Sequence, residues 1–161
     1  MRLAIFDVDG VLTDGTLWIG AAGEAFKAFN IHDGHGLKML QAAGVETAIL
    51  SGRDSGAVVR RAAELAIRHV VQGAADKNAA FDELLAASGH AAEACAFMGD
   101  DLPDLPVLRR CGFAVAVANA VDAVKAAAHY VTLAPGGHGA VREFCDLIVA
   151  ARAQLASARA V

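Results

Sequence analysis

Short apolar runs of strand length alternate with longer segments of helical spacing along most of this 161-residue chain. The strand-like runs fall at residues 3–6, 45–50, 69–71, 95–98, 113–117 and 130–133. The helix-like segments lie at about 33–43, 55–65, 76–88, 102–110 and 121–127, with a last one from about 140. Such alternation is typical of a parallel sheet with right-handed crossovers. The predicted fold is therefore α/β, a Rossmann-like parallel sheet with helices on both faces.

One stretch interrupts this alternation directly after the first strand. Residues 17–19 and 24–29 are strand-like and flank Gly20-Ala21-Ala22-Gly23, which predicts a small β-hairpin flap at about 15–30. No segment is long enough for a large cap domain, so we expect a single domain over residues 1–161. Trp18, Phe26 and Phe29 either pack on that domain or form a contact between subunits. The second interpretation is favoured because a lone hairpin is marginally stable in water.

Composition and charge exclude several classes of protein. With 56% hydrophobic residues and a net charge of −4, the chain is neither intrinsically disordered nor suited to a broad nucleic-acid surface. No uncharged apolar run approaches the ~20 residues of a membrane-spanning helix. Met1 leads almost directly into the first apolar run, and three scattered cysteines form no C-x-x-C pair. We therefore expect a cytoplasmic protein with reduced thiols.

Aspartates follow two of the predicted strands at the point where each strand ends. Asp7 and Asp9 come after the first strand, and their side chains would point the same way if that strand continued. Asp100, Asp101 and Asp104 follow another buried strand. The carboxyl ends of parallel strands meet at one edge, and converging carboxylates need a hard divalent cation, which predicts Mg²⁺. Solvated turn aspartates or a helix cap would explain single members of this set, but not all of it.

Two further groups are suited to binding phosphate. Ser51, Gly52 and Arg53 end the second strand and are predicted to open a helix, where a hydroxyl, backbone N–H groups and a guanidinium can bind an anion. Ser51 as a simple helix cap is an alternative that does not exclude phosphate. Lys77 starts a predicted helix, where its charge opposes the helix dipole. A functional role is therefore favoured, in which Lys77 neutralises a nucleophile and a phosphoryl group.

The order of these motifs is informative: D-x-D after the first strand, a serine after the second, then a lysine, then G-D-D-x-x-D. In this order the chain resembles the haloacid dehalogenase superfamily of phosphohydrolases, with all four signature motifs present. Over essentially its whole length it resembles one branch more closely, the family of 3-deoxy-D-manno-octulosonate 8-phosphate phosphatases. This closer resemblance rests on the hairpin and on DVDGVLTDG at 7–15, FNIHDG at 29–34, SGRDS at 51–55, GDDLPDLP at 99–106 and PGGHGAVRE at 135–143.

The resemblance implies a role for each residue at the strand ends. Asp7 would be the nucleophile, and Asp9 would protonate the leaving oxygen and later activate water. Mg²⁺ would bind the carboxylates of Asp7 and Asp100 and the backbone carbonyl of Asp9. Ser51 and Lys77 would complete the catalytic set by holding phosphoryl oxygens.

The resemblance also implies supporting and substrate-binding residues. Asp101 and Asp104 would support the metal and Lys77 indirectly, by orienting the groups that contact the metal and the phosphate. A sugar acid phosphate carries a carboxylate as well as a phosphate, so several cations are chemically reasonable. Without the resemblance, Lys38 and Arg61 would equally fit a solvated helix face. The implied substrate-binding set is Asp9, Asn30, Ile31, His32, Asp33, Gly34, Lys38, Ser51, Gly52, Arg53, Arg61 and Lys77.

The activity implied is Mg²⁺-dependent hydrolysis of 3-deoxy-D-manno-octulosonate 8-phosphate through an aspartyl-phosphate, a step toward lipopolysaccharide. The resemblance further implies a homotetramer in which the hairpin and the C-terminal tail complete neighbouring active sites. His32, His35 and His138 differ from the family pattern in the sugar-recognition region. Two alternatives therefore stay open: a phosphatase acting on nonulosonate 9-phosphates of the sialic-acid type, and a non-catalytic oligomerisation module.

Overall fold

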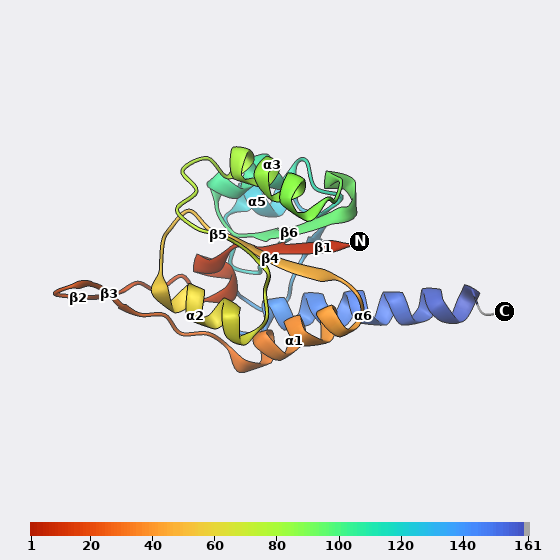
Figure 1. The fold of residues 1–161 in the computed structure, drawn as a ribbon, viewed down its shortest axis with the longest axis horizontal. Coiled ribbons are helices and arrows are strands. Elements are labelled where there is room, and N and C mark those ends of the chain that lie inside the picture. Colours follow the sequence, from red (N-terminus) through yellow and green to blue (C-terminus); the bar gives the residue numbers. More distant parts are fainter. Residues whose placement is uncertain (160–161) are drawn as a thin grey trace.

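A six-stranded sheet forms the centre of the computed structural model, which describes residues 1–159 (Figure 1). The strands are β1 (Leu3–Phe6), β4 (Glu46–Leu50), β5 (His69–Val71), β6 (Cys95–Gly99), β7 (Phe113–Ala116) and β8 (Tyr130–Val131). Their order in the sheet is β5-β4-β1-β6-β7-β8, and every neighbouring pair is parallel. The sequence therefore predicted the sheet and its strands correctly.

The strand order reverses at β1, which has β4 on one side and β6 on the other. β1 is completely apolar, and all four of its residues are buried. A crevice opens beyond the carboxyl ends of the strands at such a reversal, and it is the usual place for a ligand in open α/β sheets. A site is therefore expected among the residues that directly follow β1, β4 and β6.

Helices cover both faces of the sheet. Figure 1 shows α1, α2 and α6 on one side and α3 and α5 on the other. Their bounds are α1 (Ile31–Ala42), α2 (Gly56–Glu64), α3 (Lys77–Ser88), α4 (Leu105–Leu108), α5 (Asp122–Ala127) and α6 (Ala140–Arg159). Short helical turns, η1 (Val8–Leu12), η2 (Ala92–Ala94) and η3 (Leu102–Asp104), complete the elements outside the hairpin. None of the helices within residues 1–159 combines the length and apolar character needed to cross a membrane.

The predicted hairpin is present as β2 (Trp18–Gly20) and β3 (Gly23–Phe26), an antiparallel pair that extends away from the sheet (Figure 1). Trp18 and Phe26 stack with ring centroids 5.0 Å apart, yet each remains about half exposed. Phe29 instead packs against the core of the domain. The two interpretations of these aromatic residues therefore divide by position, with Phe29 packed on its own domain and the hairpin aromatics exposed.

The N-terminal end of α6 packs on the loop after β1. Gly137 donates its N–H to the carbonyl of Val11 at 2.9 Å, and its φ is +70°. A side chain there would bring a Cβ within 2.4 Å of the backbone nitrogen of Asp14. Only glycine allows this close approach together with this φ. The C-terminal third of the chain thus supports the loop that begins at Asp7.

Candidate active site

A cleft of about 380 Å³ lies beyond the carboxyl ends of β1, β4 and β6. Asp7 follows β1, Ser51 follows β4 and Asp100 follows β6, so neighbouring parallel strands bring them to one place. The cleft is lined by Asp7, Asp9, Ser51, Gly52, Arg53, Ala74, Ala75, Lys77, Asp100, Asp101, Pro103 and Asp104. The structure therefore brings together every residue predicted for phosphoryl transfer.

The chain turns away immediately after Asp7, and this corrects one prediction. The strand ends at Phe6 and Val8–Leu12 form a tight turn, with the Asp7 carboxylate accepting the N–H of Val8 at 2.7 Å. Asp7 and Asp9 consequently do not share one face of a continuing strand. Asp7 points toward Lys77, whereas Asp9 contacts Lys27 of the hairpin.

Lys77 connects two carboxylates inside the cleft. Its ammonium lies 2.9 Å from Asp7 Oδ2 and 2.6 Å from Asp104 Oδ1, and all three side chains are at least 90% buried. Burial and the nearby Asp104 raise the pKa of Asp7 to about 6, although Lys77 opposes this shift. Burial alone would lower the pKa of Lys77, but the two carboxylates raise it. Lys77 is therefore a cation paired directly with Asp7.

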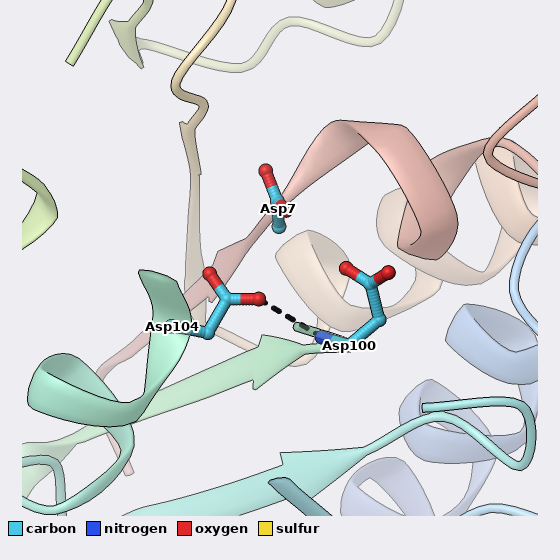
Figure 2. A group of neighbouring side chains, drawn as sticks. All are labelled: Asp7, Asp100 and Asp104. Atoms are coloured by element: carbon cyan, nitrogen blue, oxygen red, sulfur yellow. Dashed lines mark hydrogen bonds between the residues drawn. The ribbon is translucent and has the colours of Figure 1, made fainter. Parts of the chain in front are cut away.

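Asp104 also orients Asp100 (Figure 2). Its Oδ2 accepts the N–H groups of Asp100 at 2.9 Å and Asp101 at 3.2 Å. Asp101 caps the turn Leu102–Asp104 by accepting the N–H of Leu102 at 2.8 Å. Gly10, with φ +91°, leaves room for Asp100, because a Cβ there would lie 2.1 Å from Asp100 Oδ2. Asp104 thus holds the backbone at Asp100, and Asp101 caps the turn that follows it.

The carboxylates fit a magnesium ion. Asp7, Asp100 and Asp104 each place one oxygen within 4.8 Å of the others, and Figure 2 shows the three side chains grouped at the strand ends. Asp100 Oδ1 is buried and has no hydrogen-bond partner among the described residues. Burial, with Asp7 and Asp104 nearby, raises the pKa of Asp100 to about 7. Both oxygens of Asp104 are used, one by Lys77 and one by the N–H groups of Asp100 and Asp101, whereas Asp100 Oδ1 has capacity for a hard cation.

The helix predicted at about 55–65 is present as α2, but Ser51, Gly52 and Arg53 do not open it directly. α2 begins at Gly56, after a short loop, and the Ser51 hydroxyl accepts the N–H of Arg53 at 3.3 Å. Ser51 is buried and borders the cleft, but it lies five residues before the start of α2. Any phosphate held here would therefore depend on the hydroxyl, the loop N–H groups and Lys77.

Sequence reasoning missed two charged residues of the hairpin. Lys27 pairs with Asp9 and, at 3.1 Å, with Glu24. Glu24 accepts the hydroxyl proton of Ser55 and lies 3.6 Å from Arg53. The only available signal was two charges three residues apart in an otherwise apolar hairpin, and this pattern does not identify a partner.

The segment 30–34 and two cations of the predicted substrate-binding set lie outside the cleft. The Asn30 side chain caps α1, accepting the N–H of His32 at 2.8 Å. Asp33 is buried and accepts the N–H groups of Gly139 and Arg142 at the start of α6, at 3.3 Å and 2.8 Å. Burial raises the pKa of Asp33. These two polar side chains are therefore committed to helix ends.

The remaining members of the set outside the cleft differ in exposure, since Gly34 is buried and the Arg61 side chain is only 16% exposed. Ile31 is 75% exposed, and His32 is also exposed. The Lys38 ammonium donates to the carbonyl of Glu64 at 3.2 Å. Arg61 pairs with the Glu64 carboxylate at 2.8 Å and covers Gly34, whose Cβ position would lie 2.1 Å from its guanidinium. In a single chain these residues form an outer surface beside the cleft and not its lining.

The parallel sheet and its cluster of strand-end carboxylates agree with the comparisons with known proteins. A family model described as haloacid dehalogenase-like hydrolase matches residues 64–143. A probable YrbI family phosphatase from Pseudomonas syringae superposes with a TM-score of 0.92 at 52% identity, covering 99% of this chain and 91% of that one. Fold, site and match define the class: a haloacid dehalogenase-like hydrolase.

Two further relatives narrow this class. The 3-deoxy-D-manno-octulosonate 8-phosphate phosphatase KdsC of Yersinia pestis is 46% identical over 158 residues, covering 98% of this chain and 84% of the relative. The enzyme of the same name from Moraxella catarrhalis was solved with a magnesium ion, a phosphate ion and KDO. It has 42% identity and a TM-score of 0.92, covering 99% of this chain and 92% of that one. The chain belongs to the family of 3-deoxy-D-manno-octulosonate 8-phosphate phosphatases, which confirms the resemblance in its motifs.

Proposed function

We propose that this chain hydrolyses 3-deoxy-D-manno-octulosonate 8-phosphate to the free sugar acid and phosphate. One observation carries the proposal: the Asp7 carboxylate lies 2.9 Å from Lys77 in a cleft shared with Asp9, Ser51 and Asp100. The identity to phosphatases of this substrate supports the choice of sugar. A non-catalytic module would have no need of this buried and mutually repelling set of charges.

In the first half of the reaction, an oxygen of Asp7 attacks phosphorus as the bond from phosphorus to the sugar oxygen breaks. The departing oxygen takes a proton from the carboxyl group of Asp9, so that the sugar leaves as a neutral alcohol. Lys77 and the Ser51 hydroxyl bind phosphoryl oxygens and stabilise the charge that develops on them. The product of this half is an aspartyl-phosphate on Asp7.

In the second half, water attacks the same phosphorus and gives up a proton to the Asp9 carboxylate. The bond between phosphorus and the Asp7 oxygen breaks, which releases phosphate and restores both aspartates. Lys77 stays paired with Asp104 throughout and keeps a positive charge beside Asp7. Asp9 thus returns to its starting protonated form after each turnover.

Magnesium would be held by the carboxylates of Asp7 and Asp100 and, as the resemblance implies, by the backbone carbonyl of Asp9. When bound, it supplies positive charge that offsets the repulsion between a carboxylate nucleophile and a phosphate ester. The unpartnered Asp100 Oδ1 supports this choice of ligands.

The test is phosphate release from a panel of sugar phosphates, with Mg²⁺, with a chelator, and for Asp7→Asn. We expect release from the octulosonate 8-phosphate well above all other sugars, lost with the chelator and in Asp7→Asn. Asp122→Asn, at an exposed position of α5, is the matched control. Preferred release from a nonulosonate 9-phosphate would replace the substrate but keep the chemistry. No Mg²⁺-dependent release from any sugar would overturn the proposal.

We further propose that the hairpin assembles the chain into a homotetramer and that the hairpin and the C-terminal tail complete neighbouring sites. The support is the exposure of the apolar side chains Leu17, Trp18, Ile19 and Phe26 at the hairpin. Light scattering is expected to give four times 16.5 kDa for the wild type and a smaller mass for Trp18→Glu. A wild-type mass of one chain would contradict this assembly.

The cytoplasm is the location that we propose. Cys95, Cys111 and Cys145 are all buried free thiols, which suits a reducing compartment. Fractionation of cells that express the chain should recover it in the cytoplasmic fraction, and recovery in the periplasm would contradict this.

A further inference from the structure

Lys27 is the one residue of the hairpin region whose side chain closes directly on a proposed catalytic carboxylate. Lys27 is the first residue after β3. Only 3% of its side chain is exposed, although the hairpin beside it is mostly exposed. Its ammonium bonds Asp9 Oδ1 and lies 3.1 Å from Glu24 Oε2. Burying an ammonium costs free energy unless charged partners compensate, so Asp9 and Glu24 fix where Lys27 can lie.

Glu24 in turn ties the hairpin to the start of α2. Its Oε1 accepts the hydroxyl proton of Ser55, and its Oε2 lies between Lys27 and, at 3.6 Å, Arg53. Ser55 is itself buried, and its backbone N–H donates to Gln72 Oε1 at 3.0 Å. The base of the hairpin is therefore held from two sides, and Lys27 with it.

The two oxygens of Asp9 have different surroundings. Oδ1 is bound by Lys27, whereas Oδ2 is buried and has no hydrogen-bond partner among the described residues, with Arg53 Nε 3.6 Å away. A carboxyl group that transfers a proton must present one oxygen toward the leaving group in a fixed orientation. The contact to Oδ1 holds one oxygen of the Asp9 carboxylate, whereas Oδ2 has no hydrogen-bond donor of its own among the described residues.

We propose that Lys27 is a positioning residue, which fixes the Asp9 carboxylate so that Oδ2 exchanges the proton with the leaving oxygen. The inference rests on the proposed function, in which Asp9 is the acid of the first step. Lys27 acts through Asp9 and does not itself touch the phosphate. The hairpin thereby contributes to the rate of the reaction as well as to any contact between subunits.

A positioning role differs from a purely structural one in its dependence on the leaving group. A sugar oxygen leaves poorly and needs the proton from Asp9, whereas p-nitrophenolate leaves without one. The parameter kcat/KM reports events up to loss of the leaving group. Damage to the fold, to magnesium binding or to Asp7 would lower kcat/KM for both esters equally.

The experiment therefore compares kcat/KM for the octulosonate 8-phosphate and for p-nitrophenyl phosphate in wild type, Lys27→Met, Asp9→Asn and the double variant. We expect Lys27→Met to lose about 10-fold to 100-fold with the sugar phosphate and less than about 3-fold with p-nitrophenyl phosphate. Asp9→Asn should show the same selectivity more strongly. In the Asp9→Asn background, Lys27→Met should have little further effect on the sugar ester.

Two controls keep the test decisive if Lys27→Met folds poorly. Lys27→Arg keeps a cation at the same place and should recover part of the loss with the sugar phosphate only. Lys125→Met on α5 removes a lysine that is distant in sequence from the residues lining the cleft. Its kcat/KM should match that of wild type with both esters. An equal loss with both esters, or additive losses in the double variant, would overturn the positioning role. A wild type that hydrolyses neither ester would instead overturn the proposed function.

Discussion

The cleft and the outer surface differ in how their side chains are satisfied. In the cleft, Lys77 is nearly completely buried and pairs with both Asp7 and Asp104, which are buried as well. All three residues belong to the sheet's strand ends and the segments that connect its strands. On the outer surface, Ile31 and Lys38 are exposed, and Lys38 has only a backbone carbonyl as partner. If the proposed function holds, one chain assembles the residues for phosphoryl transfer within its own cleft, whereas the proposed sugar contacts lie outside it. Substitutions in the cleft should therefore change rate and stability, and substitutions outside it should change mainly substrate affinity.

Replacing Lys77 should have the largest effect. In Lys77→Met, Asp7 and Asp104 face each other in a buried site without their shared cation. We expect kcat to fall by about 10³-fold and the free energy of unfolding by about 3 kcal/mol. Steady-state kinetics and denaturant melts measure the two quantities. Unchanged stability would show that the cleft does not depend on its internal ion pairs.

Asp100 should show the dependence on pH and on metal. Its pKa of about 7 in the folded state is above the ordinary 3.8, so between about pH 4 and 7 the unfolded chain releases a proton that the folded chain keeps. Ionised Asp100 therefore lowers stability as pH rises when no cation is bound. We expect Asp100→Asn to be more stable than wild type by about 2 kcal/mol at about pH 7.5 in chelator, with no difference near pH 4.

Adding Mg²⁺ should reverse this difference, because the ion stabilises the folded wild type and not the variant. Thermal melts of both proteins across that pH range, with Mg²⁺ and with chelator, provide the measurement. A wild type that gains stability over the variant with rising pH in chelator would contradict the pKa shift.

Asp33 is an exception to the division between cleft and outer surface, because it belongs to the predicted substrate-binding set and yet is buried. Asp33→Ala leaves the N–H groups of Gly139 and Arg142 without their acceptor. We expect a loss of about 2 kcal/mol in the free energy of unfolding, read from a denaturant melt. Asp146→Ala, on the exposed part of α6, is the control. A change in KM without loss of stability would show that Asp33 acts in substrate binding and not in holding the start of α6.

Lys38 should give the smallest effect. Because its side chain is exposed, Lys38→Met should change stability by no more than about 0.5 kcal/mol. We expect KM for the sugar phosphate to rise about 3-fold to 10-fold with kcat nearly constant, since a single accessible cation contributes binding energy of that order. A fall in kcat with constant KM would move Lys38 into the reacting site.

The sequence predicted the sheet well because its information is local. Each strand is a short apolar run, and β1 and β5 have the predicted bounds. Asp7, Ser51 and Asp100 were predictable for the same reason, since each stands directly after a strand of one parallel sheet. Ser51 shows the limit of such reasoning, because the length of the loop before α2 is set by tertiary contacts such as that of Ser55 with Glu24.

The missed residues depend on contacts between distant segments. Lys27 and Asp9 are 18 positions apart, and Asp33 and Arg142 are 109 apart. Neither pairing is visible in a periodic pattern. The direction of Asp9 was also beyond prediction, because it follows from the turn that replaces a continued strand after Phe6.

The packing of the α6 N-terminus on the β1 loop has a consequence for the order of events during synthesis. β1, the first strand made, becomes a central strand, and its neighbour β6 is made more than eighty residues later. The carbonyl of Val11 accepts the N–H of Gly137, and the carboxylate of Asp33 accepts those of Gly139 and Arg142. These donors are made more than a hundred residues after their acceptors. A nascent chain on the ribosome therefore carries Asp7, Asp9 and Asp100 before these contacts can form, and the loop after β1 gains its partners only once residues 137–142 have been made.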